Sequence, residues 1–229
     1  MRDRQHRMGR PEAILTGCGT LATLLAACAS TSVASDTTLD IIFTNKGRLT
    51  GTFAGRNVDL KDELPASRGT VTGIMAGEPV DANWQIAHNG TSGQMVLPVT
   101  VNGSLARQAI SLNTVLRLMP NQLFDSGKVT GTAGGRSVQA EASSASGESS
   151  SSVNVDGSFA GTAFSLYASI AGELRNGLIR GIVGGKPAQL KARVQSGAIR
   201  ITGDYSGPSA LFVIAACTLL YYLGGIYSA

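Results

Sequence analysis

The chain of 229 residues is poor in the residues from which most active sites are built. It has 3 cysteines and 2 histidines, and charged residues make up only 15% of it. So few histidines exclude a metal cluster held by several of them. A formal net charge of +4, with no basic run outside the first ten residues, predicts no nucleic-acid partner. Aromatic residues are scarce as well, at 5%, which argues against a large enzyme core.

Few side chains qualify as candidates for catalysis. His88 lies in a polar sequence, AHNGTSG, and no GxSxG segment accompanies it. Asp59, Asp62 and Glu63 belong to a run of mixed charge, which is typical of a solvated strand end. Trp84, the single tryptophan, is expected to pack in a core. We therefore expect no catalytic, cofactor-binding or metal-binding site, and a protein that is not an enzyme.

The N-terminal sequence, MRDRQHRMGRPEAILTGCGTLATLLAACAS, has the order of an export signal. Four arginines precede an uncharged, mostly apolar run at residues 13–27, which is too short to span a bilayer comfortably. The run ends in LAAC, and small residues before a cysteine resemble a lipoprotein signal peptidase site. This resemblance implies cleavage between Ala27 and Cys28, lipidation of Cys28, and removal of residues 1–27. Ala29, where an Asp would retain a lipoprotein in the inner membrane, implies sorting to the outer membrane.

The C-terminal sequence, SGPSALFVIAACTLLYYLGGIYSA, is uncharged throughout and apolar on all sides of a helix from residue 210 to residue 227. That length is enough to span a membrane, so we predict a transmembrane segment at residues 209–229. Cys217 would then lie in the membrane, and no cysteine is left for a disulfide in the exported part. The expected anchoring residues are Ala210, Leu211, Phe212, Val213, Ile214, Leu219, Leu220, Tyr221, Tyr222, Leu223 and Ile226.

A ten-residue sequence repeat, which we call the hairpin repeat, occurs four times between the two ends, as LTGTFAGRNV, VTGIMAGEPV, VTGTAGGRSV and IRGIVGGKPA. In each copy apolar residues alternate with polar ones up to a glycine, and the alternation then changes phase. A single strand cannot change phase in this way, whereas a hairpin does. The expected turn glycines are Gly55, Gly77, Gly135 and Gly185.

The register of these hairpins is predicted from the first copy. If Phe53 pairs with Val58, then Gly51 pairs with Leu60, and all four lie on one face. A two-residue loop remains possible on this pattern, but Pro79 in the second copy argues for a four-residue loop, because proline has no N–H to close a tight turn. Gly51 lies inside a strand, which suggests a bulge, a sharp bend or a bulky neighbour above it.

A second similarity relates VNGSLARQAISL (residues 101–112) to VDGSFAGTAFSL (residues 155–166). It suggests that a unit of about 55 residues is duplicated. The sequence at residues 106–120 fits either a helix or two strands, and we prefer strands at residues 109–112 and 115–119.

The predicted fold class is all-β, with repeated antiparallel hairpins arranged as a meander, a sandwich or a small barrel, plus one C-terminal transmembrane helix. The predicted domains are a signal peptide (1–27), a flexible tether (28–40), a β-rich periplasmic domain (41–204) and the transmembrane segment (209–229).

This layout resembles the unimolecular spanins of phages that infect Gram-negative hosts. The residues that carry the resemblance are LAAC near one end and ALFVIAACTLLYYLGGIY near the other. The resemblance implies a host-lysis protein that bridges the outer and inner membranes and promotes their fusion. Its partners would be the lipids of both membranes, with an endolysin and a holin acting in the same process, and it could form a homo-oligomer. The alternative is a bacterial envelope lipoprotein with a structural or assembly role, in which both anchors lie in one membrane.

Overall fold

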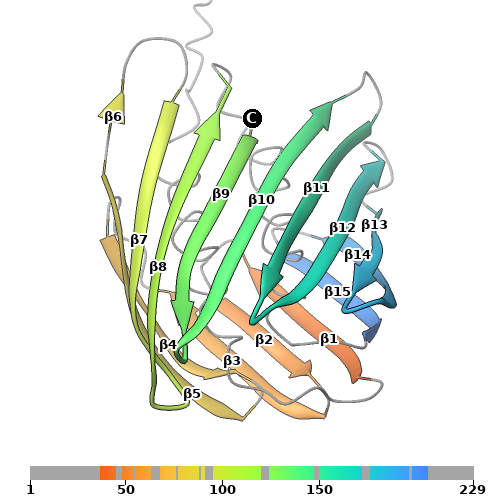
Figure 1. The fold of residues 1–229 in the computed structure, drawn as a ribbon. Helices are drawn as coiled ribbons and strands as arrows, with labels where there is room; N and C mark the ends of the chain where they lie inside the picture. The colour runs from red at the N-terminus through yellow and green to blue at the C-terminus, as the bar shows by residue number, and fades with distance from the viewer. Residues whose placement is uncertain are drawn as a thin grey trace, which may run out of the picture.

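A computed structural model describes residues 37–44, 48–53, 55–62, 68–75, 77–87, 89–90, 95–119, 124–146, 150–171, 176–195 and 198–205. The regular elements in these ranges are all β-strands (Figure 1). In chain order they are β1 (Thr37–Thr44), β2 (Arg48–Phe53), β3 (Arg56–Asp62), β4 (Arg68–Met75), β5 (Glu78–Ile86), β6 (Asn89–Gly90), β7 (Met95–Leu105), β8 (Gln108–Leu118), β9 (Phe124–Ala133), β10 (Arg136–Ser146), β11 (Ser150–Phe159), β12 (Thr162–Ala171), β13 (Asn176–Val183), β14 (Lys186–Gln195) and β15 (Ala198–Tyr205).

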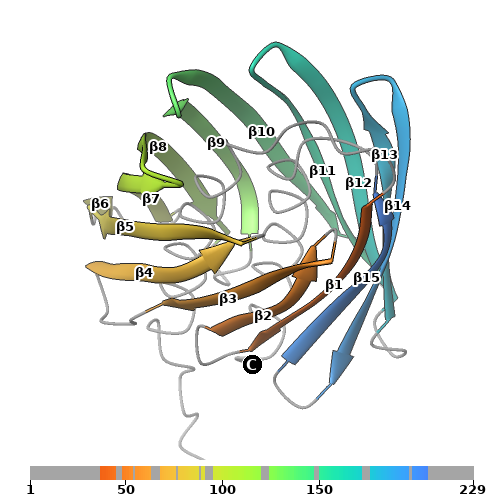
Figure 2. The same cartoon turned by 90° about the horizontal axis from the view of Figure 1, so that it is seen from below.

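The strands form a closed antiparallel barrel of 14 strands, to which the short β6 is added beside β7. They follow one another around the wall in chain order, and Figure 2, a view from below, shows the wall curving round. Two pairings complete the ring. β1 pairs with β15 from Thr37↔Tyr205 onward, and β5 pairs with β7 from Val80↔Leu105 onward. Each of the 14 described wall strands therefore has a hydrogen-bonded neighbour on both sides.

This closed barrel corrects the predicted fold class. The described part of the chain is all-β with antiparallel hairpins, as expected, and of the three predicted arrangements it is not a sandwich: the strands follow one another as in a meander that closes into a barrel of 14 strands. The described residues contain no helix, so the predicted C-terminal transmembrane helix is not supported. The described part of the chain accordingly offers no helix that could span a membrane. Residues 209–229, with the eleven predicted anchoring side chains, lie outside the described residues.

Alternating side chains give the wall an apolar inner face and a polar outer face. In β5 the residues Val80, Ala82 and Trp84 are buried, while Asp81 and Asn83 between them are exposed. All 14 wall strands contribute at least one residue to a single cluster of buried hydrophobic side chains. Burial of this continuous apolar face drives closure of the sheet. Trp84 is a core residue in this cluster, with 2% of its surface exposed.

The hairpin repeat occurs more often in the structure than the four copies recognised from the sequence. Each copy has a central glycine, with buried residues two before it and two, seven and nine after it. The segments at Gly103 and Gly157 share this pattern, so there are copies in β2–β3, β4–β5, β7–β8, β9–β10, β11–β12 and β13–β14. Gly203 in β15 starts a further copy, whose second strand is supplied by β1 at the other end of the chain. The predicted 55-residue unit is therefore two successive hairpins.

The central glycines mark places where neighbouring strands approach closely, and we call them the kink glycines. They are Gly51, Gly73, Gly103, Gly131, Gly157, Gly181 and Gly203. A Cβ atom added at any of them would lie 2.0–2.8 Å from a carbonyl oxygen of the adjacent strand. At Gly51 the φ angle is +138° and the register runs through without a shift, so the explanation is a bend and not a bulge. A glycine repeated on alternate strands is a known way to curve a sheet until it closes.

The predicted hairpin register was wrong by two residues. Phe53 pairs with Arg56 and Gly51 with Val58, so the loop has two residues rather than four. Pro79 does not prevent this, because it lies opposite Ile74, one pair beyond the turn. In a two-residue hairpin that pair does not exchange N–H···O bonds, so proline loses nothing there.

The segment after the third hairpin turn was also divided wrongly. β8 is one continuous strand, not two, and Ile110, Leu112, Thr114, Leu116 and Leu118 all point to the buried face. The segment is one strand because five residues at alternate positions, one of them a threonine, face inward without interruption.

Candidate functional site: the tight-turn rim

The barrel has two unlike ends. The six copies that are continuous in sequence all turn at the same end, because successive wall strands are antiparallel. We call this end the tight-turn rim; among the described residues it comprises 55–56, 77–78, 106–108, 134–136, 160–162 and 184–186. Figure 1 shows the turns that join β7 to β8, β9 to β10 and β11 to β12 on one side of the barrel.

Four turns of this rim, at residues 106–107, 134–135, 160–161 and 184–185, have the positive φ angles of type I′ hairpins at both positions. Gly134 and Gly135 both have positive φ angles, of 60° and 72°. The turn between β7 and β8 has the same geometry without glycine, with φ of 48° at Ala106 and 66° at Arg107. This turn type matches the twist of paired strands, and it normally favours glycine or asparagine. The four predicted turn glycines all lie on this rim, and their φ angles are between 70° and 84°.

Four of the six turns carry an exposed cation, namely Arg56, Arg107, Arg136 and Lys186. Glu78 is the one carboxylate among the rim residues. Within the described part of the chain, none of these four cations forms an ion pair. The cations are spread around the ring of turns, so the rim as a whole presents a positive face to the surroundings.

Both ends of the described chain also lie at the tight-turn rim. Thr37, the first residue of β1, is paired with Tyr205, the last residue of β15. The segments that lead to the predicted lipidation site and to the apolar C-terminal run are therefore joined to neighbouring strands at the same end of the barrel. Ala27 and Cys28 themselves lie outside the described residues.

An ion pair crosses the line where β1 meets β15, which we call the seam. Arg200 on β15 donates from Nε to Oδ1 of Asp40 at 2.8 Å and from Nη2 to Oδ2 at 2.5 Å. The hydrogen bond from Arg200 holds the pKa of the Asp40 carboxyl below its ordinary value. Both side chains are about half exposed, so the contribution of the pair to stability is small. Its position matters more than its strength, because it joins residues 160 apart in sequence.

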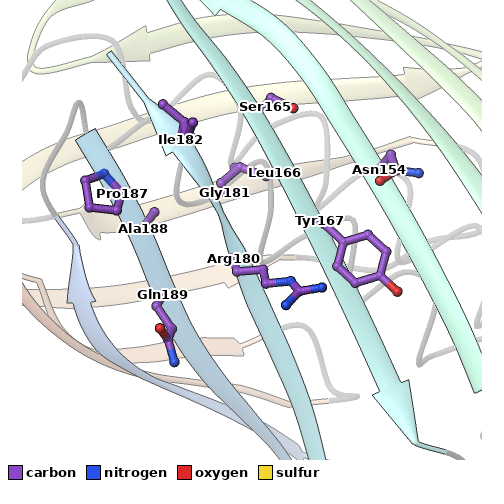
Figure 3. Close-up of a pocket in the computed structure, with 10 residues that line it drawn as sticks. All are labelled: Asn154, Ser165, Leu166, Tyr167, Arg180, Gly181, Ile182, Pro187, Ala188 and Gln189. Atoms are coloured by element: carbon purple, nitrogen blue, oxygen red, sulfur yellow. The ribbon is translucent and has the colours of Figure 1, made fainter. Parts of the chain in front are cut away.

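An open depression lies on the described outer wall, over β11 to β14 (Figure 3). Its volume is about 420 Å³, and it lies where Gly181 leaves the wall without a side chain. The guanidinium of Arg180 lies 5.3 Å from the centre of the Tyr167 ring, so the one cation of the depression is already engaged with an aromatic face. Asn154, Ser165 and Gln189 complete a polar margin, and the residues that line the depression include no carboxylate and no histidine to activate the Ser165 hydroxyl.

The remaining sequence candidates do not form a reactive centre in the described structure. Asp59 accepts two hydrogen bonds from Arg48, at 3.2 and 3.1 Å, in an exposed ion pair on the wall. His88 and Glu63 lie outside the described residues, as does the side chain of Asp62. Among the described side chains, no three of His, Cys, Asp or Glu are grouped to hold a metal ion.

One polar side chain is buried in the apolar interior. Thr114 is 1% exposed, and its Oγ1 has no hydrogen-bond partner. It occupies an inward position of β8, opposite Val99 and Val129. Nothing else polar in the described interior accompanies it, so it does not build a binding site.

Sequence reasoning found the turn glycines but missed the rim and the seam. The signal for the rim was present in the copies at Gly103 and Gly157, which place Arg107 and Gly161 at the same turn position as Gly55. No family of proteins, no curated protein and no solved structure matches this chain.

Proposed function

We propose that this chain is an envelope lipoprotein with a structural or assembly role, held at one membrane by a lipid on Cys28. The barrel is its rigid body, and the tight-turn rim is the side that faces the membrane. The observation that supports this most is the pairing of Thr37 with Tyr205, which brings the segments leading to both predicted anchors to one end of the barrel.

Chain length supports a position close to one membrane. Nine residues separate the barrel from Cys28, inclusive of the cysteine, and a fully extended chain of that length spans at most about 32 Å. Residues 206–209 add at most about 14 Å on the other side of the seam. With the barrel folded, the lipid and the apolar C-terminal run are thus within about 50 Å of each other once the strand spacing of about 5 Å is added, which is close to the thickness of a single bilayer.

The wall itself also favours a self-contained body. Edge strands are the usual route by which sheets join to copies of themselves, and closure leaves the described wall strands without a free edge. Any partner must therefore bind the polar outer wall or one of the two rims. A structural or assembly role needs no reactive centre, in keeping with the absence of candidate catalytic pairs in the sequence.

Host lysis remains the second candidate, on the resemblance to unimolecular spanins. The 18-residue uncharged run at the C-terminus is the feature of the sequence that favours it. A folded barrel keeps its two ends together, so a form bridging two separated membranes would require β1 and β15 to part. We place this role second because the C-terminal helix is unsupported and the ends of the barrel are adjacent.

Lipid labelling and membrane fractionation test the proposal. The wild-type protein should incorporate labelled palmitate and be recovered in the outer-membrane fraction of a density gradient. Cys28→Ser should abolish the label and remove the protein from that fraction. Cys18→Ser is the matched control, because LTGC also fits a lipobox, and it should change neither result.

Two outcomes would overturn the one-membrane role. One is loss of labelling in Cys18→Ser but not in Cys28→Ser, since the lipid would then be attached to a different residue. The other is recovery of the wild-type protein from both membranes, together with lysis when it is expressed with an endolysin in high magnesium. That result would establish the lysis role instead.

A further inference from the structure

We propose that the tight-turn rim is a docking surface for anionic lipid headgroups. The inference rests on the proposed function, because a lipid on Cys28 would hold this rim within reach of a membrane. It goes beyond that function by naming the lipid chemistry that the rim recognises and the residues that recognise it.

Charge at the turns is the first argument. Arg56, Arg107, Arg136 and Lys186 are exposed and belong to four separate hairpins, so their recurrence follows the rim and not a single strand. Arg107 is retained at a positive φ angle of 66°, where glycine would be the relaxed choice. Because this turn position is strained for arginine, the side chain costs stability there. A contact made by the cation would offset that cost and explain why the turn has arginine.

Exposed apolar side chains beside the turns are the second argument. Ile182 is 56% exposed and Ile74 is 40% exposed, and each is the second residue before a two-residue turn. Each lies opposite an exposed proline on the next strand, Pro187 and Pro79 respectively. These pairs occupy equivalent positions in two hairpins that flank the seam and the β2–β3 hairpin. Cations with isolated apolar groups near them are what an interfacial membrane contact requires.

The position of the rim is the third argument. The seam opens onto the tight-turn rim at Thr37 and Tyr205, so the lipid tether emerges among these turns. A body tethered from one rim presents that rim to the membrane first.

The test compares two variants of the full chain that have the same net charge. Both carry Cys28→Ser, so that no lipid contributes. The rim variant adds Arg56→Gln, Arg107→Gln, Arg136→Gln and Lys186→Gln. The control variant adds Arg68→Gln, Arg117→Gln, Lys191→Gln and Arg193→Gln, which are exposed cations of the wall and the opposite end. Flotation measures binding to vesicles of phosphatidylcholine alone and of phosphatidylcholine mixed with phosphatidylglycerol.

A cation near an anionic bilayer strengthens binding by about fivefold, so loss of four should weaken it at least tenfold. We expect that loss in the rim variant and less than a threefold change in the control, on the mixed vesicles only. Raising the salt well above about 0.15 M should bring the parent and control proteins down towards the rim variant. Both proteins keep the same arginines at the N-terminus, so only the location of the charges differs.

Equal binding of the two variants to the mixed vesicles would overturn the docking surface, as would equal binding of the parent to both kinds of vesicle. The second result would assign membrane binding to apolar segments alone. Either result leaves the lipid labelling at Cys28 untouched, so failure of the docking surface is distinguishable from failure of the proposed function. Circular dichroism of both variants confirms that the barrel is intact in each.

Discussion

The seven hairpin units of the barrel are built alike, but six are closed by a turn and one by pairing alone. In the β9–β10 hairpin the two strands are joined at Gly134 and Gly135, so they cannot separate far. At the seam, β1 and β15 are joined by eight registered residue pairs and the Asp40–Arg200 ion pair. The buried pattern around the kink glycine is the same in both, as Ile201 before Gly203 matches Val129 before Gly131. The comparison shows that packing and register specify this unit, and that the turn adds only local restraint.

The kink glycines should give the largest effects in either kind of unit. In Gly131→Ala the new Cβ would lie 2.2 Å from the Ser111 carbonyl oxygen, at a φ of +149°. We expect a loss on the order of 4 kcal/mol in the free energy of unfolding, measured by urea titration. Gly203→Ala in the seam should cost less, because its nearest backbone atom is 2.8 Å away.

The control for this prediction is Gly135→Ala, in the turn of the same hairpin as Gly131. Nothing lies within 4 Å of the added Cβ there, so only its φ of +72° is unfavourable. We expect a cost of about 1 kcal/mol. Equal costs for Gly131→Ala and Gly135→Ala would show that close approach of the strands is not what fixes the glycine.

Matched core truncations separate the seam from a hairpin closed by a turn. Ile201 in β15 and Ile179 in β13 both precede a kink glycine by two residues and are almost fully buried. Changing either to Ala should lower the free energy of unfolding by about 3 kcal/mol. Only Ile201→Ala should also speed hydrogen exchange of β1 and β15 more than that of other strands, because the seam has no turn to hold it. Equal exchange in the two variants would contradict this distinction.

The turn between β7 and β8 should be improved by glycine. Arg107→Gly removes a side chain from a φ of 66°, and we expect a gain of about 1 kcal/mol in the free energy of unfolding. The control is Arg136→Gly, which removes the same charge from the residue just after a turn and should give no gain. A gain in both variants would point to relief of charge repulsion on the rim.

The smallest effect is expected from the ion pair of the seam. Asp40 has a lowered pKa in the folded state, so its stabilising contribution is present above the unfolded value of about 3.9 and is lost as the pH falls through the folded pKa. Asp40→Asn should therefore be slightly less stable than wild type at neutral pH, and the difference should shrink as the pH falls below the unfolded value and vanish below the folded pKa. Asp59→Asn, which breaks the pair with Arg48 inside a turn-closed hairpin, should leave hydrogen exchange at the seam unchanged.

Local features of the fold could be predicted from the sequence, but its closure could not. The change of phase after Gly55 indicated a hairpin, and the burial of Val58 and Leu60 on one face follows from it. The register failed because Pro79 was taken to exclude a tight turn, although it pairs beyond the turn. Two copies were missed because Val99 and Val153 replace the leading glycine from which the copies were aligned.

Closure depends on pairs that no local pattern encodes. Ile41 pairs with Ile201, and Ile86 pairs with Val99 across the connection at residues 87–94. The same alternating strands would serve an open sheet equally well, so only the summed burial of the complete ring selects the barrel. The rim could not be predicted either, because Arg56, which lies near β1, and Lys186, which lies near β15, are brought to the same part of the rim only when β1 pairs with β15.

A thiol cross-link across the seam tests the closed barrel most directly. The variant carries Asp40→Cys and Thr202→Cys, which are directly paired, in a chain whose three native cysteines are replaced by serine. Paired side chains have Cβ atoms about 5 Å apart, so a short bifunctional thiol reagent should link them nearly completely and make the chain migrate faster on a denaturing gel. A second pair, Asp40→Cys with Arg180→Cys, is three strands apart at about 14 Å and should not react. Failure of the first pair to link, or equal linking of both, would contradict a barrel in which the two ends of the chain meet at one rim.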